Sequence, residues 1–302
     1  GLLGLTDASS TLADKYLLVN TASNPGAGIV NQTIQFHSSA DLYSLNGATS
    51  IATLYSDANT ATSNPAVTTK TVGTNGGRAS AFTYDLAKCV VYTRQGNPAW
   101  AGQERDNHTD VIRPDDLFFP DYVDLNKVQI PQADEQQRLL ANMITEFSLE
   151  KKPLPRFWYL PNGKKAAIVY TLDDHASPHA TKDVFDKFIA NSPANCSVTD
   201  WECMRGTSWF YLGSNLNNSE AAAYYGQGFE MGVHVQNGCT NFNSFAGLNQ
   251  TYTDTLNQFQ ANFPSLPAPT THRYHCIPWS DWLSQARAEL FHNIRYSMDY
   301  YY

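Results

Sequence analysis

The feature that most constrains the fold is a regular alternation in the second half of the chain, between about residues 165 and 298. Short apolar runs there are separated by amphipathic segments long enough to cross between strands. This alternation is typical of parallel strands joined by helices, in a doubly wound sheet or a barrel. The predicted strands are residues 165–172, 208–212, 229–235, 270–274 and 293–298, and the predicted helices are 178–190, 219–225, a segment around 256–263, and 280–290.

The first hundred or so residues have a different character, being rich in Ala, Thr, Ser, Asn and Gly. Helical periodicity is weak there, and apolar runs such as residues 48–55 and 79–93 favour short strands and loops. Lone His37 and His108 are interpreted as structural or surface residues. We predict a smaller α/β module over residues 1–112.

A connector and a helix are expected between these parts, over residues 113–154. Residues 113–122 are rich in Pro and Asp, and Pro153 and Pro155 end the helix that follows. The helix is predicted because apolar side chains recur on one face, at Leu139, Leu140, Met143, Ile144 and Phe147. The second domain is then residues 155–302.

Ionisable side chains collect where the predicted strands end. In parallel α/β architectures, ligands and catalytic groups gather at the carboxyl ends of the strands. We therefore expect a functional site at this rim. Its members lie at the ends of four of the predicted strands and are Asp173, Asp174, His234, Arg273, His275 and Asp299.

The adjacent carboxylates Asp173 and Asp174 suit metal-assisted hydrolysis. Neighbouring side chains on a regular strand point to opposite sides, so both serve one site only where the strand breaks into a loop. One carboxylate can then hold a divalent ion while the other accepts a proton from water. The alternative is a solvated turn that caps the helix at Pro178. Likewise His234 is either a ligand or a hydrogen-bonded core residue, and Arg273 either orients a carboxylate or forms an ordinary ion pair.

The motif Thr171-Leu172-Asp173-Asp174 resembles the Thr-x-Asp-Asp motif of polysaccharide deacetylases, a family of carbohydrate esterases. The resemblance covers residues 155–302 and implies an incomplete or distorted (β/α) barrel. By resemblance Asp173 is the catalytic base, Asp174 and His234 are metal ligands, and Arg273 positions the base. The chain also resembles a subgroup in which Asp-Asp-His follows the first strand and Gly-x-His-Val the third, and secreted exopolysaccharide deacetylases look similar.

The chain departs from the family pattern at two places. The family has a second His four residues after the first, but Gly238 stands at that position here. His175 is therefore the first candidate for the third metal ligand, with His179 and Asn237 as alternatives. The family's general acid is a His near the end of the domain. The sequence stops before it. Either another residue is the acid, with His275 as the nearest candidate, or the domain is incomplete, which is the interpretation that we favour.

The resemblance implies N-deacetylation of an acetylated amino-sugar polysaccharide, with a divalent metal, zinc above all, as cofactor. The alternatives are a non-catalytic carbohydrate-binding protein on the same fold and an O-acetyl esterase. Aromatic side chains near the rim, Trp279, Trp282 and Tyr300–Tyr302, are candidates for a sugar pocket. Residues 84–87 and 94–97 resemble part of a glutamine-amidotransferase-like module, expected here without catalytic activity.

Charge and cysteine content indicate where such a protein works. A net charge of −8 argues against a general nucleic-acid binder, and no apolar run reaches membrane-spanning length. Two disulfides are predicted, Cys196–Cys203 across a short loop and Cys239–Cys276 between strand ends, with Cys89 left as a buried thiol. The alternative is that all five cysteines are reduced. Disulfides favour a secreted or cell-surface protein.

Overall fold

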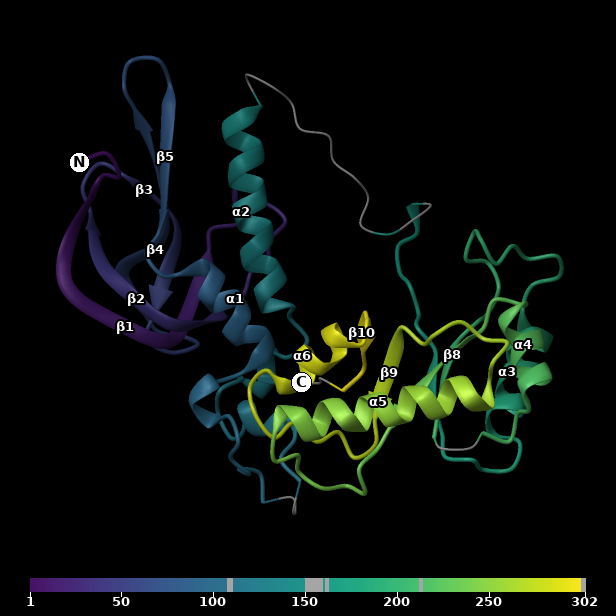
Figure 1. The fold of residues 1–302 in the computed structure, drawn as a ribbon. Coiled ribbons are helices and arrows are strands. Elements are labelled where there is room, and N and C mark those ends of the chain that lie inside the picture. The colour runs from purple at the N-terminus through teal and green to yellow at the C-terminus, as the bar shows by residue number, and fades with distance from the viewer. Residues whose placement is uncertain (108–110, 150–159, 161–162, 212–213, 300–302) are drawn as a thin grey trace. The chain divides into compact units, whose positions relative to one another are not determined.

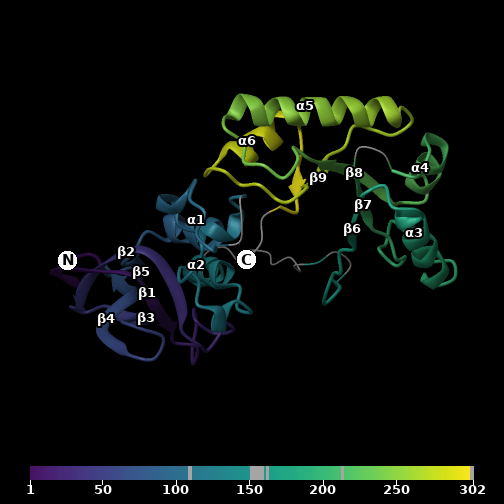
Figure 2. The same cartoon turned by 90° about the horizontal axis from the view of Figure 1, so that it is seen from below.

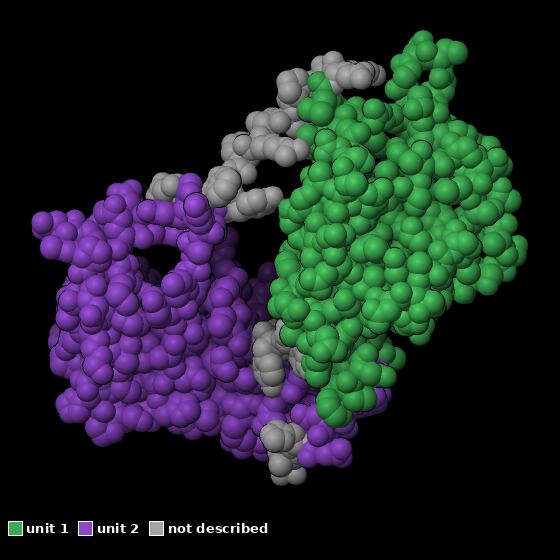
Figure 3. All heavy atoms as spheres, turned by 180° about the vertical axis from the view of Figure 1, so that it is seen from behind, with its two compact units in different colours: residues 1–99, 117–156 green, residues 100–116, 157–302 purple. Residues whose placement is uncertain are grey.

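A computed structural model describes residues 1–107, 111–149, 160, 163–211 and 214–299. The predictions for His108, Pro153, Pro155 and Tyr300–Tyr302 therefore lie outside the described residues. The chain forms two compact units, coloured separately in Figure 3. The first unit contains residues 1–99 and 117–156, and the second contains residues 100–116 and 157–302.

The units differ from the predicted division near residue 112. Residues 100–116 belong to the second unit, where Ile112 N donates to Asn241 Oδ1 at 2.9 Å and Trp279 N donates to Ile112 O at 2.7 Å. The chain then returns to the first unit for the long helix. Such contacts join residues more than 120 positions apart, and local composition carries no signal for them.

The first unit is built on a five-stranded antiparallel sheet with strand order β2-β1-β3-β4-β5 (Figure 1). One face of this sheet forms the core with two helices, through residues such as Phe36, Leu54 and Met143. The amidotransferase-like resemblance stays a prediction. The strands are β1 Leu5–Val19, β2 Ile34–Leu45, β3 Thr49–Tyr55, β4 Ala61–Val72 and β5 Gly77–Phe82, and the helices are α1 Leu86–Gln95 and α2 Gln132–Ser148.

Two local predictions for this unit are corrected. Part of the apolar run 79–93 is helix α1, because the Asp85 side chain accepts a hydrogen bond from Lys88 N and caps the helix. Helix α2 exists as predicted, but Ile144 is half exposed. Its buried face instead continues through Gln132 and Gln136, whose amides bond to the backbone of Gln35.

The second unit contains the predicted parallel strands joined by helices. Strand order is β10-β9-β8-β7-β6, the order of the sequence itself, with β6 and β10 at the edges. Figures 1 and 2 show this sheet beside helices α3 to α6. A barrel stays a prediction. The elements are β6 Thr171–Asp174, α3 Ala180–Asn191, β7 Thr207–Phe210, α4 Asn218–Tyr225, β8 Glu230–Val235, α5 Phe245–Asn262, β9 Thr271–Tyr274, α6 Ser284–Phe291 and β10 Tyr296–Ser297.

Strand β6 is shorter than the predicted strand 165–172, since pairing with β7 begins only at Thr171. Ile168 and Val169 are exposed. All four helices contribute to a single core cluster with the sheet, which includes Phe185, Tyr224 and Phe259. Right-handed crossovers between strands in sequential order place their helices on one face, which explains the single core.

Both predicted disulfides are confirmed, and both lie in the second unit. Cys196–Cys203 closes the loop before β7, and Cys239–Cys276 joins the segments that follow β8 and β9. Cys89 is free and buried, as predicted. No helix within the described ranges has the length and hydropathy needed to cross a membrane.

Candidate metal centre

The site forms at the carboxyl ends of β6, β8 and β9, and alternation along β8 decides what reaches it. Met231, Val233 and Val235 belong to the core under the helices. Successive side chains on a strand point to opposite faces, so His234 lies on the face away from that core. A buried imidazole is thereby placed at a strand end without entering the apolar layer.

The same alternation separates the two adjacent carboxylates, because both lie within strand β6. Asp174 is 1% exposed and faces the helices, where its Oδ2 accepts hydrogen bonds from Thr181 and Ser214. Its Oδ1 accepts from Ala176 N at 2.8 Å. Asp173 points to the other face. The two carboxylates thus do not share one site in the described structure, and the predicted role of Asp174 as a metal ligand stays a prediction.

Asp173 lies beside Arg273, its predicted partner. Arg273 Nε is 3.4 Å from Asp173 Oδ2, and Asp173 Oδ1 is 4.0 Å from His234 Nδ1. The register of the sheet explains why these three side chains lie close together. His234 pairs with Arg273 in the β8–β9 ladder. Asp173 pairs with Trp209, which in turn pairs with Gly232, two residues before His234. The Asp173 carboxylate therefore lies beside a guanidinium and is only partly shielded from water.

Three histidines converge at the rim. His234 Nε2 is 3.1 Å from His175 Nε2 and 3.1 Å from His275 Nδ1. Among the described residues, one ring nitrogen from each of the three lies within 4.8 Å of the other two. His175 directly follows β6, and His275 directly follows β9. The backbone N–H of His275 donates a hydrogen bond to Val235 O at 2.7 Å.

Burial and neighbouring charges favour the neutral form of His234 and His275. Desolvation, followed by the neighbouring His175 and His275, lowers the pKa of His234 from 6.5 to about 3. Desolvation and His175 also lower the pKa of His275, although Asp173 opposes the shift. Neutral imidazole is the form that binds metal, so the environment prepares both rings as ligands near neutral pH.

The donor set fits a transition metal, zinc in particular. Zinc takes imidazole nitrogen at about 2.0–2.1 Å in tetrahedral sites, which places ligand nitrogens roughly 3.3 Å apart. The 3.1 Å separations around His234 are close to that value. His234 Nδ1 is buried with no hydrogen-bond partner among the described residues, and it faces the Asp173 carboxylate. Catalytic zinc sites use three protein ligands and keep the fourth position open.

A glycine makes the floor of this site possible. A Cβ atom at Gly232 would stand 2.5 Å from Trp209 Cδ1 and 2.6 Å from Thr271 O. The Trp209 indole therefore crosses the strand where a side chain would otherwise be, and its Nε1 reaches Thr271 Oγ1 at 3.4 Å. This packing supports the neighbouring strands β7, β8 and β9, of which β8 carries His234.

Other predicted residues lie elsewhere. His179 is exposed, 4.0 Å from Asp183, and Asn237 donates to Thr240 O at 2.7 Å. Asp299 is fully buried, where it accepts hydrogen bonds from Tyr274 N and Gln285 Nε2, and burial raises the pKa of its carboxyl. Trp279 is also buried. These residues belong to the surface or the core rather than to the histidine cluster.

Tyr211 is a site residue that sequence analysis missed. Its ring centroid lies 5.7, 6.0 and 5.4 Å from those of His175, His234 and His275. Its N–H donates to Asp174 O at 2.8 Å, which continues the β6–β7 ladder past Phe210. The available signal was its position at the end of a predicted strand.

Comparison with protein-family models, with curated proteins and with solved structures finds no match to this chain. What the protein does must therefore be inferred from the residues of this site.

Proposed function

We propose that this protein is a metal-dependent hydrolase that removes N-acetyl groups from an amino-sugar polysaccharide. The observation that carries the proposal is the cluster of His175, His234 and His275 beside the Asp173–Arg273 ion pair. It brings three imidazole nitrogens and a carboxylate that can act as a base together at one strand-end rim. The acetamide as substrate follows from the resemblance of the Thr171–Asp174 motif.

We assign the three histidines as the protein ligands of the metal. A bound divalent ion would polarise the acetamide carbonyl and lower the pKa of water toward neutrality. Asp174 is assigned to the structure instead, since its oxygens already accept three hydrogen bonds. His175 thus replaces the family's missing second His, and His275 joins the ligands rather than acting as the acid.

Asp173 moves the proton in this proposal. Its carboxylate accepts one proton from the attacking water, whose oxygen bonds to the carbonyl carbon. When the C–N bond breaks, the same carboxyl returns this proton to the amine nitrogen. The product leaves as acetic acid, which then loses its proton to water or to the free amine and becomes acetate. Arg273 orients the Asp173 carboxylate for the first step, and the Tyr211 ring limits the space around the histidines.

The test is acetate release by zinc-loaded protein from an N-acetylglucosamine hexamer and from an N-acetylgalactosamine polymer. O-acetylated xylan serves as the comparison substrate. Release from an N-acetylated substrate, lost in Asp173→Asn, supports the proposal. Release from the xylan alone would make the protein an O-acetyl esterase. A metal-loaded protein that releases acetate from none of them would overturn the proposed hydrolysis.

The two disulfides support work outside the cell, because such bonds persist in oxidising compartments. We propose a secreted or cell-surface location, where polysaccharide substrates are found. Expression with and without an oxidising export route, followed by thiol counting, tests this: recovery of folded protein with its four paired cysteines reduced would contradict it.

A further inference from the structure

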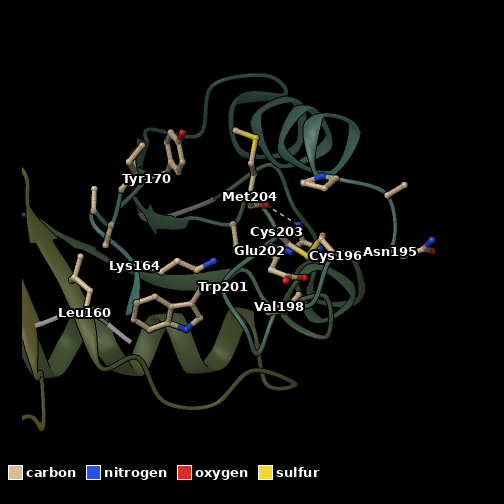
Figure 4. Close-up of a pocket in the computed structure, with 17 residues that line it drawn as sticks. Leu160, Lys164, Tyr170, Asn195, Cys196, Val198, Trp201, Glu202, Cys203 and Met204 are labelled. Atoms are coloured by element: carbon tan, nitrogen blue, oxygen red, sulfur yellow. Dashed lines mark hydrogen bonds between the residues drawn. A yellow bond between two sulfur atoms is a disulfide. The ribbon is translucent and has the colours of Figure 1, made fainter. Parts of the chain in front are cut away.

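A second cavity lies at the opposite end of the parallel sheet from the histidines. It has a volume of about 880 Å³ and is bordered by the start of β6, the loop before β7 and the turn before β8 (Figure 4). The length of β7, roughly 10–13 Å, separates it from the rim. The lining residues used below are Lys164, Tyr170, Asn195, Trp201, Glu202 and Arg205.

One tryptophan dominates this cavity. Trp201 is 61% exposed, whereas Trp209 and Trp279 are buried. In Figure 4 its indole projects from the loop toward Leu160 and Lys164. Its backbone has φ +59°, a left-handed conformation that bulky residues rarely adopt. A bulky residue in a left-handed backbone conformation costs free energy, and such strain persists mainly at functional positions.

The loop that carries Trp201 is fixed by four independent contacts. The Cys196–Cys203 disulfide closes it, and Glu202 bonds to Ser197 through both its backbone N–H and its side chain, each at 3.0 Å. Met204 N donates to Ser192 Oγ at 3.0 Å. The indole is therefore presented on a pre-organised loop, which lowers the entropic cost of binding.

The fourth contact depends on a glycine. Gly228 has φ +91°, and a Cβ atom there would stand 2.6 Å from Val198 Cγ1. The loop can approach the turn before β8 this closely only because position 228 has no side chain.

The polar groups of the cavity favour a neutral ligand rich in hydroxyl groups. Arg205 is committed to the protein, because its Nε donates to Gln227 O and its Nη1 to Met204 O and Ser192 Oγ. Glu202 is likewise engaged with Ser197. The lining mixes apolar side chains such as Ile168 and Val198 with polar ones, so it suits a ligand that presents both kinds of surface. A sugar ring matches both features, since its C–H face packs on indole and its hydroxyls bond to polar neighbours such as Asn195.

We infer that the Trp201 cavity is a second, non-catalytic binding site for a glycan chain, with Trp201 as its stacking platform. The site does not depend on the metal centre, because it shares no residue with it. It would hold a polysaccharide to the protein by a segment other than the one at the rim.

Calorimetric titration of the Asp173→Asn protein in metal-free buffer tests the site without consuming ligand. The probes are three hexasaccharides: N-acetylglucosamine hexamer, its fully deacetylated form and cellohexaose. Binding of at least one is expected. Trp201→Ala should weaken it by about tenfold or more, and Trp201→Phe should restore part of the affinity.

Phe291→Ala is the matched control, since Phe291 is an exposed aromatic outside the cavity. It should leave binding unchanged. Circular dichroism and zinc uptake of each variant confirm folding. Absence of binding for all three probes at millimolar concentration, or equal binding by Trp201→Ala, would overturn the inference. A failure of acetate release would leave these titrations unaffected, so the two proposals fail separately.

Discussion

His37 in the first unit and His234 in the second have closely matched surroundings. They are 2% and 1% exposed, and the Nδ1 of each lacks a hydrogen-bond partner among the described residues. Each Nδ1 also faces an aspartate, Asp14 at 3.9 Å and Asp173 at 4.0 Å. Desolvation lowers both pKa values, to about 4 for His37 and about 3 for His234.

The difference lies in what surrounds the rest of the ring. His37 stacks on Tyr122, with centroids 4.1 Å apart, and no group of possible metal ligands among the described residues includes it. His234 has a second and a third imidazole at 3.1 Å, and Arg273 holds its aspartate. Burial and a lowered pKa are therefore shared by a packing residue and a candidate ligand. Convergence of further donors distinguishes them.

The largest expected effect comes from removing each histidine in turn. His234→Gln should lower zinc affinity by more than about 100-fold and abolish acetate release. It removes His234 Nε2, the atom that lies 3.1 Å from a ring nitrogen of both His175 and His275. His37→Gln should leave the zinc stoichiometry unchanged. Metal analysis after dialysis measures both. Equal zinc loss in the two variants would break the distinction.

The two aspartates provide the next comparison. Asp173→Asn should reduce acetate release by about 10²–10⁴-fold, because amide cannot accept the proton. Zinc content should not change. Asp14→Asn, with the same spacing to a histidine, should retain activity. Steady-state rates on the N-acetylglucosamine hexamer decide the matter, and full activity in Asp173→Asn would exclude it as the base.

His37 should make the first unit sensitive to acid. Its pKa is about 4 when folded and 6.5 when exposed, so the unfolded state binds more protons between these values. The free energy of unfolding is therefore highest above pH 6.5 and falls by up to about 3 kcal/mol as the pH drops to 4. Hydrogen exchange of β2 amides in wild type and His37→Phe reports it. A pH dependence that persists unchanged in the variant would show that other groups cause it.

The smallest expected effect concerns Arg273. Arg273→Lys keeps the charge but loses the planar donor group, and should lower acetate release by about tenfold through poorer orientation of Asp173. Steady-state rates on the N-acetylglucosamine hexamer measure the loss. An unchanged rate would mean that Arg273 serves only the structure.

The sequence predicted the arrangement of strand ends well, since apolar runs and helical periodicity mark β8, β9 and their crossovers. The rim position of His234 and Arg273 followed from that pattern. Alternation along a strand predicts that Asp173 and Asp174 point to opposite faces if both belong to the strand. The local sequence does not show whether the strand ends before them. Pairing of Thr171–Asp174 with β7 decided it.

Other features depended on distant contacts. His275 joins the cluster because its N–H bonds to Val235, some 40 residues earlier, and Cys276 is tied to Cys239. Residues 100–116 enter the second unit through Asn241 and Trp279, which no local pattern announces. Trp201 was also not predicted as a binding residue, because neither its exposure nor the cavity around it follows from the spacing of residues in the sequence.

The most direct test of the metal centre is a crystal structure of zinc-loaded protein with anomalous data collected at the zinc absorption edge. We predict an anomalous peak for a zinc ion bound by His175 Nε2, His234 Nε2 and His275 Nδ1. Asp174 should still accept hydrogen bonds from Thr181 and Ser214. A peak bound by Asp174 in place of His275, or no peak at saturating zinc, would contradict the three-histidine centre.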